Sequence, residues 1–227
     1  MPTKYPVNNF ILLIILSAIW GSAFFAIKVG LNDFSPIAVA SLRLIIASIF
    51  LLFLFYIQKK HIVFTKEVLF LLVIIGIIGN FIPFFLISWA EQFIPSSTAG
   101  MLMAIGPIIT LVMSHFLTKN EKFSLMKIVS IVIGLVGVFF IFNVNSLDNF
   151  FSNSSMEIYA KLLVILAAFG YMFSNIIAYE KLTNIDSFSI TTFATTFGAI
   201  FSLPFFIYDI GINDFNYDFD YKSAYAI

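Results

Sequence analysis

The chain has 227 residues, of which 61% are hydrophobic and 11% are charged. Soluble domains are about 45–50% apolar and about 25% charged, so this composition indicates a protein of the lipid bilayer. The 12 basic and 12 acidic residues cancel, which gives no electrostatic reason to expect a nucleic-acid partner. The absence of cysteine excludes disulfides, zinc–thiolate centres and thiol chemistry.

Seven apolar segments are long enough to cross a bilayer, which takes about 20 residues of helix. In chain order they are residues 10–29, 37–57, 68–89, 97–118, 123–142, 158–179 and 188–208. The first could be taken for a signal peptide, but its apolar stretch exceeds the usual length of a signal core and six more spans follow it. Most connectors are short, and the longest, 143–157, has the Asn- and Ser-rich composition of a linker. The sequence predicts an all-α polytopic membrane protein.

The lysines are distributed unevenly between the two sides that these spans define. A cytoplasmic N-terminus places most of them in the cytoplasm, namely Lys4, Lys59, Lys60, Lys66, Lys119, Lys122, Lys127 and Lys181, and leaves Lys28, Lys161 and Lys222 on the far side. Cytoplasmic loops carry the excess of positive charge in membrane proteins. We therefore predict a multi-pass protein of the cell membrane, the inner membrane in a bacterium, with its N-terminus in the cytoplasm.

Two short stretches suggest an internal duplication. ILSAI at 15–19 resembles ILAAF at 165–169, and LND at 31–33 resembles LTN at 182–184. The interval contains five spans, and an odd number of spans inverts the second copy with respect to the membrane. Inverted repeats of this kind build many secondary transporters.

The stretch WGSAFFAIKVGLNDFSPIAVASLRLIIAS, residues 20–48, carries a family resemblance. Its Trp-Gly pair, the lysine that ends the first helix, the Ser-Pro that opens the second and the arginine seven residues later resemble the start of an EamA domain of the drug/metabolite transporter superfamily. Pro107, Glu121, Gly134 and Gly137 are similar to later positions of that domain.

This resemblance implies ten helices in two inverted five-helix repeats, of which seven are present here. Residues 1–145 would form the first repeat, and residues 156–227 an incomplete second one with helices six, seven and the start of eight, which residues 222–227 resemble. We expect the natural protein to continue for about 70 residues, enough for three more spans. The implied function is a permease or exporter that moves a small metabolite, such as an amino acid or a drug-like compound, by alternating access.

Several polar or helix-loosening residues fall at the middle of their spans. They are Trp20 and Gly21, Asn80, Gly106 and Pro107, and Gly170 and Tyr171. Transporters built from repeats bind substrate near this depth, so we predict that substrate is bound by Trp20, Phe24, Asn80, Phe84, Met103, Tyr171 and Asn175, next to helix breaks at Pro83 and Pro107. An alternative remains for the first helix, in which Ser17 and Gly21 let another helix approach and Trp20 fills a gap.

Four charged residues are candidates for structural or pathway roles, namely Lys28, Arg43, Glu91 and Glu121. Lys28 falls near the membrane surface, where an interfacial anchor is expected. Arg43 falls about 10 Å inside its span, where it is expected to pair with helix-end carbonyls or Glu91, or to contact substrate. No carboxylate lies in the middle of a span, so the sequence predicts no buried carboxylate relay.

Other classes of membrane protein fit less well. A receptor with seven helices would place its N-terminus outside, and a retinal protein needs a lysine in its last span, which 188–208 lacks. An intramembrane enzyme needs a nucleophile with a base, or a metal cluster, and neither can be assembled from these spans. The alternative that remains is a non-transporting seven-helix membrane protein, receptor-like or a scaffold. We predict no catalytic residue, metal or cofactor; the expected partners are a small-molecule substrate, the lipid bilayer and a second copy in a homodimer.

Overall fold

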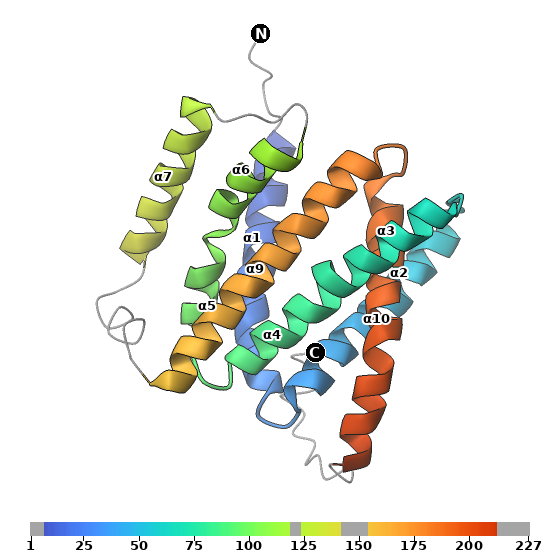
Figure 1. Ribbon diagram of the computed structural model, residues 1–227, viewed down its shortest axis with the longest axis horizontal. Helices are drawn as coiled ribbons and strands as arrows, with labels where there is room; N and C mark the ends of the chain where they lie inside the picture. Colours follow the sequence, from blue (N-terminus) through green and yellow to red (C-terminus); the bar gives the residue numbers. More distant parts are fainter. Residues whose placement is uncertain (1–6, 119–123, 142–153, 213–227) are drawn as a thin grey trace.

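A computed structural model describes residues 7–118, 124–141 and 154–212. All regular structure among these residues is helical (Figure 1). The elements are α1 (Val7–Gly30), α2 (Pro36–Ile57), α3 (Lys66–Gly76), a π-helical turn η1 (Ile77–Phe81), α4 (Ile82–Ala90), α5 (Ser96–Met103), α6 (Gly106–Leu117), α7 (Leu125–Ile141), α9 (Ser155–Lys181) and α10 (Ser187–Ile212).

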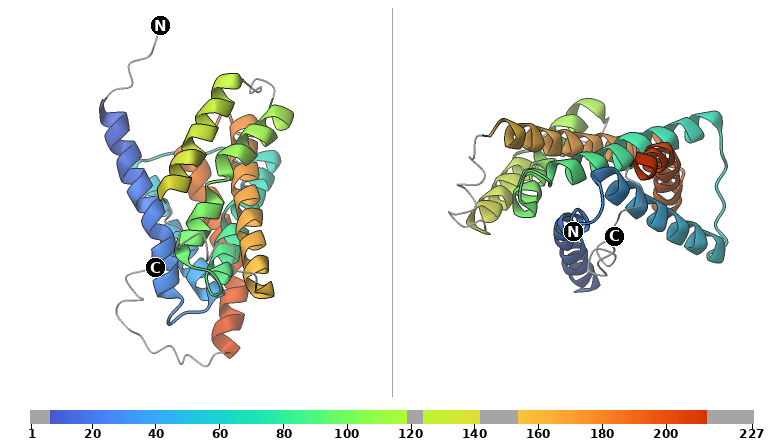
Figure 2. Two further views of the ribbon diagram at one scale, coloured as in Figure 1. Left: turned by 90° about the vertical axis from the view of Figure 1, so that its left-hand side faces the viewer. Right: turned by 90° about the horizontal axis from the view of Figure 1, so that it is seen from below.

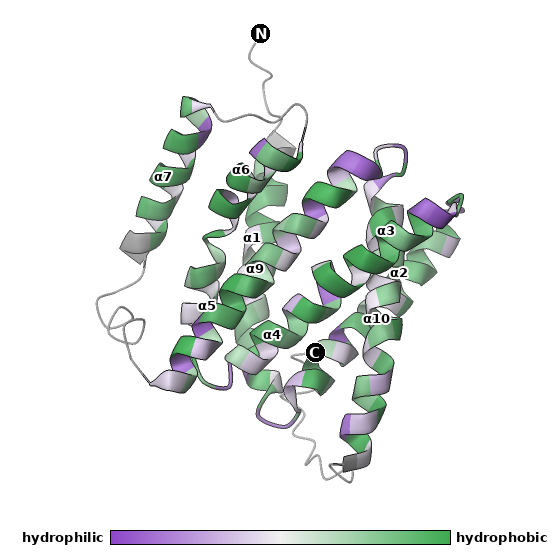
Figure 3. Cartoon of the chain, viewed as in Figure 1, coloured by the Kyte–Doolittle hydropathy of each residue, from purple (hydrophilic) through white to green (hydrophobic). Residues whose placement is uncertain are grey.

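Six stretches are long and apolar enough to cross a membrane, which confirms the predicted all-α membrane protein. They are Phe10–Gly30, Pro36–Ile57, Lys66–Ala90, Ser96–Leu117, Ser155–Lys181 and Ser187–Gly211. The predicted fifth span, 123–142, contains α7, which has 17 residues and an apolar stretch at Leu125–Val138 within the described part of the chain. Figure 3 shows apolar residues along most of each helix and polar residues gathered near the ends.

Parts of the predicted organisation lie outside the described residues. The boundary near residue 145 and the helix start at 222–227 are among them. The inverted repeats and the ten-helix architecture therefore stay predictions.

Local sequence signals account for where several helices begin. The Ser35 hydroxyl accepts a hydrogen bond from the Ala38 amide at 3.1 Å, and Pro36 occupies the first position of α2. Thr65 caps α3 and Ser154 caps α9 in the same way. A capping oxygen satisfies an amide that has no partner within the helix, and proline at the first position loses no such bond.

The middle of the α3–η1–α4 span packs very closely against α9 and α10. A Cβ added to Gly76 would lie 2.4 Å from the Ala194 carbonyl oxygen of α10, and one added to Gly170 of α9 would lie 2.7 Å from the Ile78 carbonyl oxygen. Only glycine permits such an approach of two backbones, which is how small residues pack helices in membranes. Figure 1 shows α3 and α4 running beside α9, with α10 crossing them.

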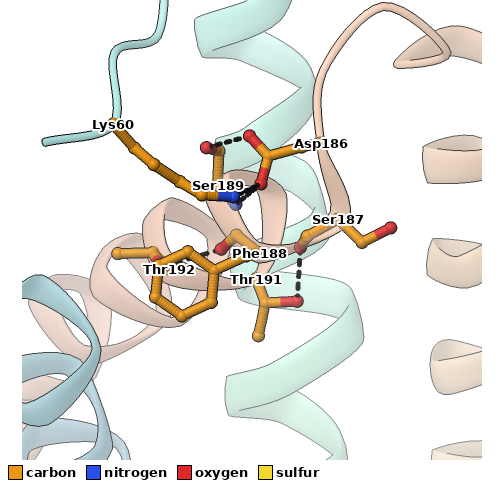
Figure 4. A network of polar contacts seen from close by, with 7 residues as sticks. All are labelled: Lys60, Asp186, Ser187, Phe188, Ser189, Thr191 and Thr192. Carbon is orange, nitrogen blue, oxygen red and sulfur yellow. Dashed lines mark hydrogen bonds and ion pairs between the residues drawn. The ribbon is translucent and has the colours of Figure 1, made fainter. Parts of the chain in front are cut away.

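Polar contacts join α10 to neighbouring elements. Lys60, in the connector after α2, forms an ion pair with Asp186, which also accepts from the Ser189 amide and hydroxyl at the start of α10 (Figure 4). The hydrogen bonds from Lys60 and Ser189 lower the pKa of Asp186 to about 2. Deeper in the bundle, the Ser48 hydroxyl of α2 donates to Thr196 of α10 at 3.0 Å.

Replacement of Gly76 tests the close packing of α3 against α10. Gly76→Ala places a methyl group against fixed backbone atoms of α10, and overpacking of this kind costs about 1–3 kcal/mol of stability. We expect the thermal midpoint of the purified protein in detergent to fall.

Gly134→Ala is the matched control, because a Cβ at Gly134 on α7 meets nothing within 4 Å. It should leave the midpoint unchanged or raise it slightly, since alanine favours helix. Equal midpoints for the two variants would contradict the close approach.

Candidate functional site

A pocket with a volume of about 1030 Å³ runs beside the interrupted helix pair α5 and α6. This is at the upper end of the range of small-molecule sites, about 300–1,000 Å³. Helices α1, α5 and α6 form most of its wall, and α7 and α9 complete it. We call it the α1–α6 pocket. Its lining includes Trp20, Phe24, Ser96, Ser97, Gly100, Met103, Gly106, Pro107, Thr110, Ser114, Lys127, Ser130 and Met172.

A break in the helix gives this pocket its shape at mid-span. Helix α5 ends at Met103 and α6 begins at Gly106, with Ala104 and Ile105 forming a turn between them. Pro107 has no amide proton to donate to the Met103 carbonyl, so this region cannot continue as regular helix. A Cβ on Gly106 would lie 3.1 Å from the Met172 methyl group, so glycine leaves room for α9 to approach the break.

Three predicted substrate residues, Trp20, Phe24 and Met103, line the α1–α6 pocket together with the predicted break at Pro107. Trp20 has 66% of its surface exposed. It therefore fills no gap in the interior of the described structure, and the gap-filling alternative for this residue is not supported. A Cβ at Gly21 meets nothing within 4 Å, so no described helix approaches α1 at that point.

Two other predicted residues, Phe84 and Tyr171, form a separate contact between α4 and α9. Their rings lie edge to face with centroids 6.1 Å apart. The Arg43 guanidinium of α2 lies 4.8 Å from the centre of the Phe84 ring, a cation–π contact. The second predicted break, Pro83, is buried beside this contact, with its Cγ 3.2 Å from a Cβ built on Gly170.

The remaining predicted residues, Asn80 and Asn175, line a second pocket of about 510 Å³ between η1, α9 and α10. We call it the α9–α10 pocket. Its wall is richer in hydrogen-bonding groups and also includes Ser174, Tyr179, Thr183, Ser187 and Thr191. Asn80 lies in the π-helical turn, a distortion often found at functional positions. The seven predicted residues thus fall into three groups rather than around one cavity.

A charge cluster of Lys28, Arg43 and Glu91, in which Glu91 is buried and the two cations are half-buried, lies at the end of the bundle where α1 and α4 end. Lys28 donates to the main-chain carbonyls of Glu91 and Ile94, so it is Lys28 that bonds the helix-end carbonyls expected for Arg43. Glu91 is fully buried, and neither of its carboxyl oxygens has a hydrogen-bond partner among the described residues. The fourth candidate, Glu121, lies outside the described residues.

Sequence reasoning missed some of this arrangement. Met172 was overlooked although it follows Tyr171, because apolar residues at mid-span are too common to single one out. The π-helical turn carries no distinct sequence signal beyond Gly79, Asn80 and the proline at 83. Among the described residues, no three His, Asp or Glu side chains come together as a metal site would need.

Comparisons with known proteins agree with this architecture. The chain is 29% identical to the uncharacterized transporter YoaV of Bacillus subtilis, over 87% of this chain and 66% of YoaV. It is 26% identical to the uncharacterized transporter YetK of the same bacterium, over 99% of this chain and 68% of YetK. An uncharacterized transporter of Buchnera aphidicola is 32% identical over 54% of this chain and 40% of its own length.

The chain thus spans about two thirds of the length of the two Bacillus relatives. No solved structure matches it. Residues 8–143, which include α1 to α7, match the EamA-like transporter family. The chain belongs to the EamA-like transporter family.

Proposed function

We propose that the protein transports a small metabolite across the cell membrane by alternating access and binds it in the α1–α6 pocket. The observation that carries this proposal is the pocket itself, which lies at mid-span along a broken helix. Transporters commonly bind substrate where a spanning helix is interrupted, since the break frees backbone groups for the ligand. The family and the transporter names of the relatives support the same activity.

The pocket lining points to a neutral or zwitterionic substrate with an apolar body. Trp20, Phe24, Met103 and Met172 provide aromatic and thioether surfaces. Hydroxyl groups at Ser96, Ser97, Thr110, Ser114 and Ser130 supply hydrogen bonds at intervals along the wall. A site of this type orients a small molecule by a few polar contacts and buries the rest. Amino acids and drug-like compounds meet these requirements.

Helix α1 is the element best suited to move in the transport cycle. Its spanning window is 6% buried, against 17% to 39% for the other candidate spans. Figure 2 shows it to one side of the helices around α9, and it contacts mainly α5. A helix with few packing contacts changes position at low cost. Since α1 carries Trp20 and Phe24, its movement would open or close the pocket.

The α9–α10 pocket is a second candidate location for the substrate. Asn80 and Asn175 supply amide groups there, and Ser174 supplies a buried hydroxyl that has no hydrogen-bond partner among residues 7–118, 124–141 and 154–212. A polar substrate would suit this pocket better than the apolar α1–α6 pocket. Homodimer formation stays a separate prediction.

The first test concerns the role of Trp20. We expect Trp20→Ala to lower uptake about tenfold or more, a loss of about 1.4 kcal/mol of binding. Thermal stability should stay unchanged, because Trp20 is exposed and its removal opens no interior cavity. Uptake of a panel of radiolabelled amino acids into proteoliposomes is measured beside the melting midpoint in detergent.

Ile19→Ala is the matched control, since Ile19 adjoins Trp20 and is 59% exposed but does not line the pocket. Normal uptake by Trp20→Ala, together with a lower melting midpoint that corresponds to a loss of about 3–5 kcal/mol in the free energy of unfolding, would assign Trp20 to packing instead. Loss of uptake in Asn80→Ala and Asn175→Ala but not in Trp20→Ala would move the site to the α9–α10 pocket.

A second test compares the two cations near the pocket. We expect Arg43→Ala to lower both uptake and the melting midpoint more than Lys28→Ala. Arg43 stacks on Phe84 in the interior, whereas water near the membrane surface can replace the Lys28 ammonium at the carbonyls that it bonds. Arg43→Lys keeps the charge and should fall between them, because lysine lacks the planar group. Equal, negligible effects would remove both charges from the pathway.

A third test concerns orientation in the membrane. Because this 227-residue chain contains no cysteine, single cysteines can be introduced at His61 and at Asn32, exposed residues in connectors at opposite ends of the spans. A membrane-impermeant maleimide added to whole cells should label Asn32→Cys and leave His61→Cys unlabelled until the cells are opened. Labelling of His61→Cys alone would reverse the proposed cytoplasmic N-terminus.

A further inference from the structure

Glu91 occupies an unusual environment for a carboxyl group. It directly follows α4, in the turn of residues 91–95 that leads to α5, and lies outside the candidate spans, which end at Ala90 and resume at Ser96. Its side chain nevertheless has no exposed surface, because Ala90 and Ile94 on either side of it pack against Ala160 and Val164 of α9. The sequence placed Glu91 near a helix end and gave no sign of this burial.

Two cations act on this carboxyl without bonding it. The Lys28 ammonium donates to the carbonyls of Glu91 and Ile94, and the Arg43 guanidinium lies over Phe84 with its Nη1 atom buried and without a hydrogen-bond partner in the described part of the chain. The Tyr171 ring of α9 lies edge to face against the same Phe84 ring. Helix α5 has no ionisable residue, and the acidic groups on the α1–α2 turn and on α10 are Asp33 and Asp209, the latter accepting from Ser35.

An ionised carboxylate without partners is costly in such a place, so the neutral acid competes with it. Burial raises the pKa of the Glu91 carboxyl from 4.5 to about 8, while Lys28 and, less strongly, Arg43 favour the ionised form. Both forms are therefore populated near neutral pH. Uptake of one proton by Glu91 changes the charge of the cluster by one unit.

The same cluster is continuous with the wall of the α1–α6 pocket. Phe24, one helical turn before Lys28, lines the pocket and packs against the apolar group around Ala90 and Ile94. Ser96 and Ser97, which follow the turn that contains Glu91, line it as well. Lys28 thus joins α1, the helix that we propose to move, to the turn that carries the titrating carboxyl.

We propose that Glu91 is a proton-binding site that couples opening of the α1–α6 pocket to proton uptake and release. The proton comes from water and binds one carboxylate oxygen of Glu91. It returns to water after α1 has moved to its other position in the transport cycle. Protonation removes the negative charge that attracts Lys28, so the hold of the α4–α5 turn on the end of α1 weakens. This inference rests on the proposed transport function, to which it adds the coupling ion.

Infrared spectroscopy tests the proton site without any substrate. Between about pH 6 and about pH 10, where exposed carboxyls stay ionised, the wild-type protein should lose the carbonyl band of a protonated acid, with a midpoint far above that of an ordinary glutamate. The band should be absent in Glu91→Gln and shifted in Glu91→Asp. Glu67→Gln, a control at an exposed glutamate of α3, should keep it. A wild-type protein without this titration overturns the proposal, even if Glu91→Gln fails to fold.

The pH dependence of thermal stability is a second test of whether Glu91 titrates, because the raised pKa fixes the direction of the change. A glutamate whose pKa is higher in the folded state contributes stability below its unfolded pKa, and this contribution is lost as the pH rises through the folded pKa. The melting midpoint of the wild type should therefore fall relative to that of Glu91→Gln between about pH 5 and about pH 8. Parallel curves for the two proteins would contradict a titrating Glu91.

Tryptophan fluorescence tests the link to the pocket. The chain has two tryptophans, so Trp89→Phe leaves Trp20 as the only one. Quenching of Trp20 by acrylamide in proteoliposomes should change with pH at the midpoint of the infrared band, and Glu91→Gln should abolish the change. Titration of Glu91 without a change at Trp20 overturns the coupling.

These experiments distinguish a failure of the proposed proton site from a failure of the proposed transport function. Transport of a panel compound by a protein whose Glu91 does not titrate refutes the proton site alone. A titrating Glu91 that controls Trp20, together with failure of every panel compound, refutes the proposed substrate class alone.

Discussion

The arrangement depends on the contact of η1 and the end of α3 with α9 and α10, where backbones approach more closely than side chains would permit. Gly76 and Gly198 meet at the α10 side, and Gly79 and Gly170 meet Ser174 and the Ile78 carbonyl at the α9 side. In lipid, where apolar burial gives little drive for helices to associate, close packing of small residues takes its place. This contact sets the height of α9 relative to α4. It therefore brings Tyr171 to Phe84 and places Asn175 in the same pocket as Asn80.

Helix α9 then separates two pockets of different chemistry. Met172 faces the apolar α1–α6 pocket, whereas Ser174 and Asn175 line the polar α9–α10 pocket. Tyr171, whose ring contacts Phe84, precedes Met172 on α9, and Ser174 and Asn175 follow within one helical turn. The Arg43 guanidinium lies over the Phe84 ring of this contact. A change at this contact would reach the walls of both pockets.

The sequence was sufficient for the helical membrane fold because span length and apolar composition are properties of each segment alone. Among the described residues, six of the seven predicted spans are long and apolar enough to cross a membrane, and the remaining one, predicted at 123–142, contains the shorter apolar helix α7. The depth of Trp20, Pro107 and Tyr171 along their helices could also be estimated from the sequence, since it follows from the rise per residue. Depth does not determine the direction in which a side chain points. That direction depends on the rotation of each helix against its neighbours, which is why Trp20 and Asn80 line different pockets.

The burial of Glu91 could not be inferred for a related reason. In the sequence it is a polar residue in a short connector, and connectors normally lie at the surface. Here the connector folds inward, because the small residues Ala90, Ala99 and Ala160 let α4, α5 and α9 converge around it. The carboxyl is then enclosed by apolar groups, while the Lys28 ammonium is taken by carbonyls. Burial without a hydrogen-bond partner among the described residues favours the neutral acid, and this raises the pKa of the Glu91 carboxyl although its place in a connector suggests an ordinary exposed glutamate.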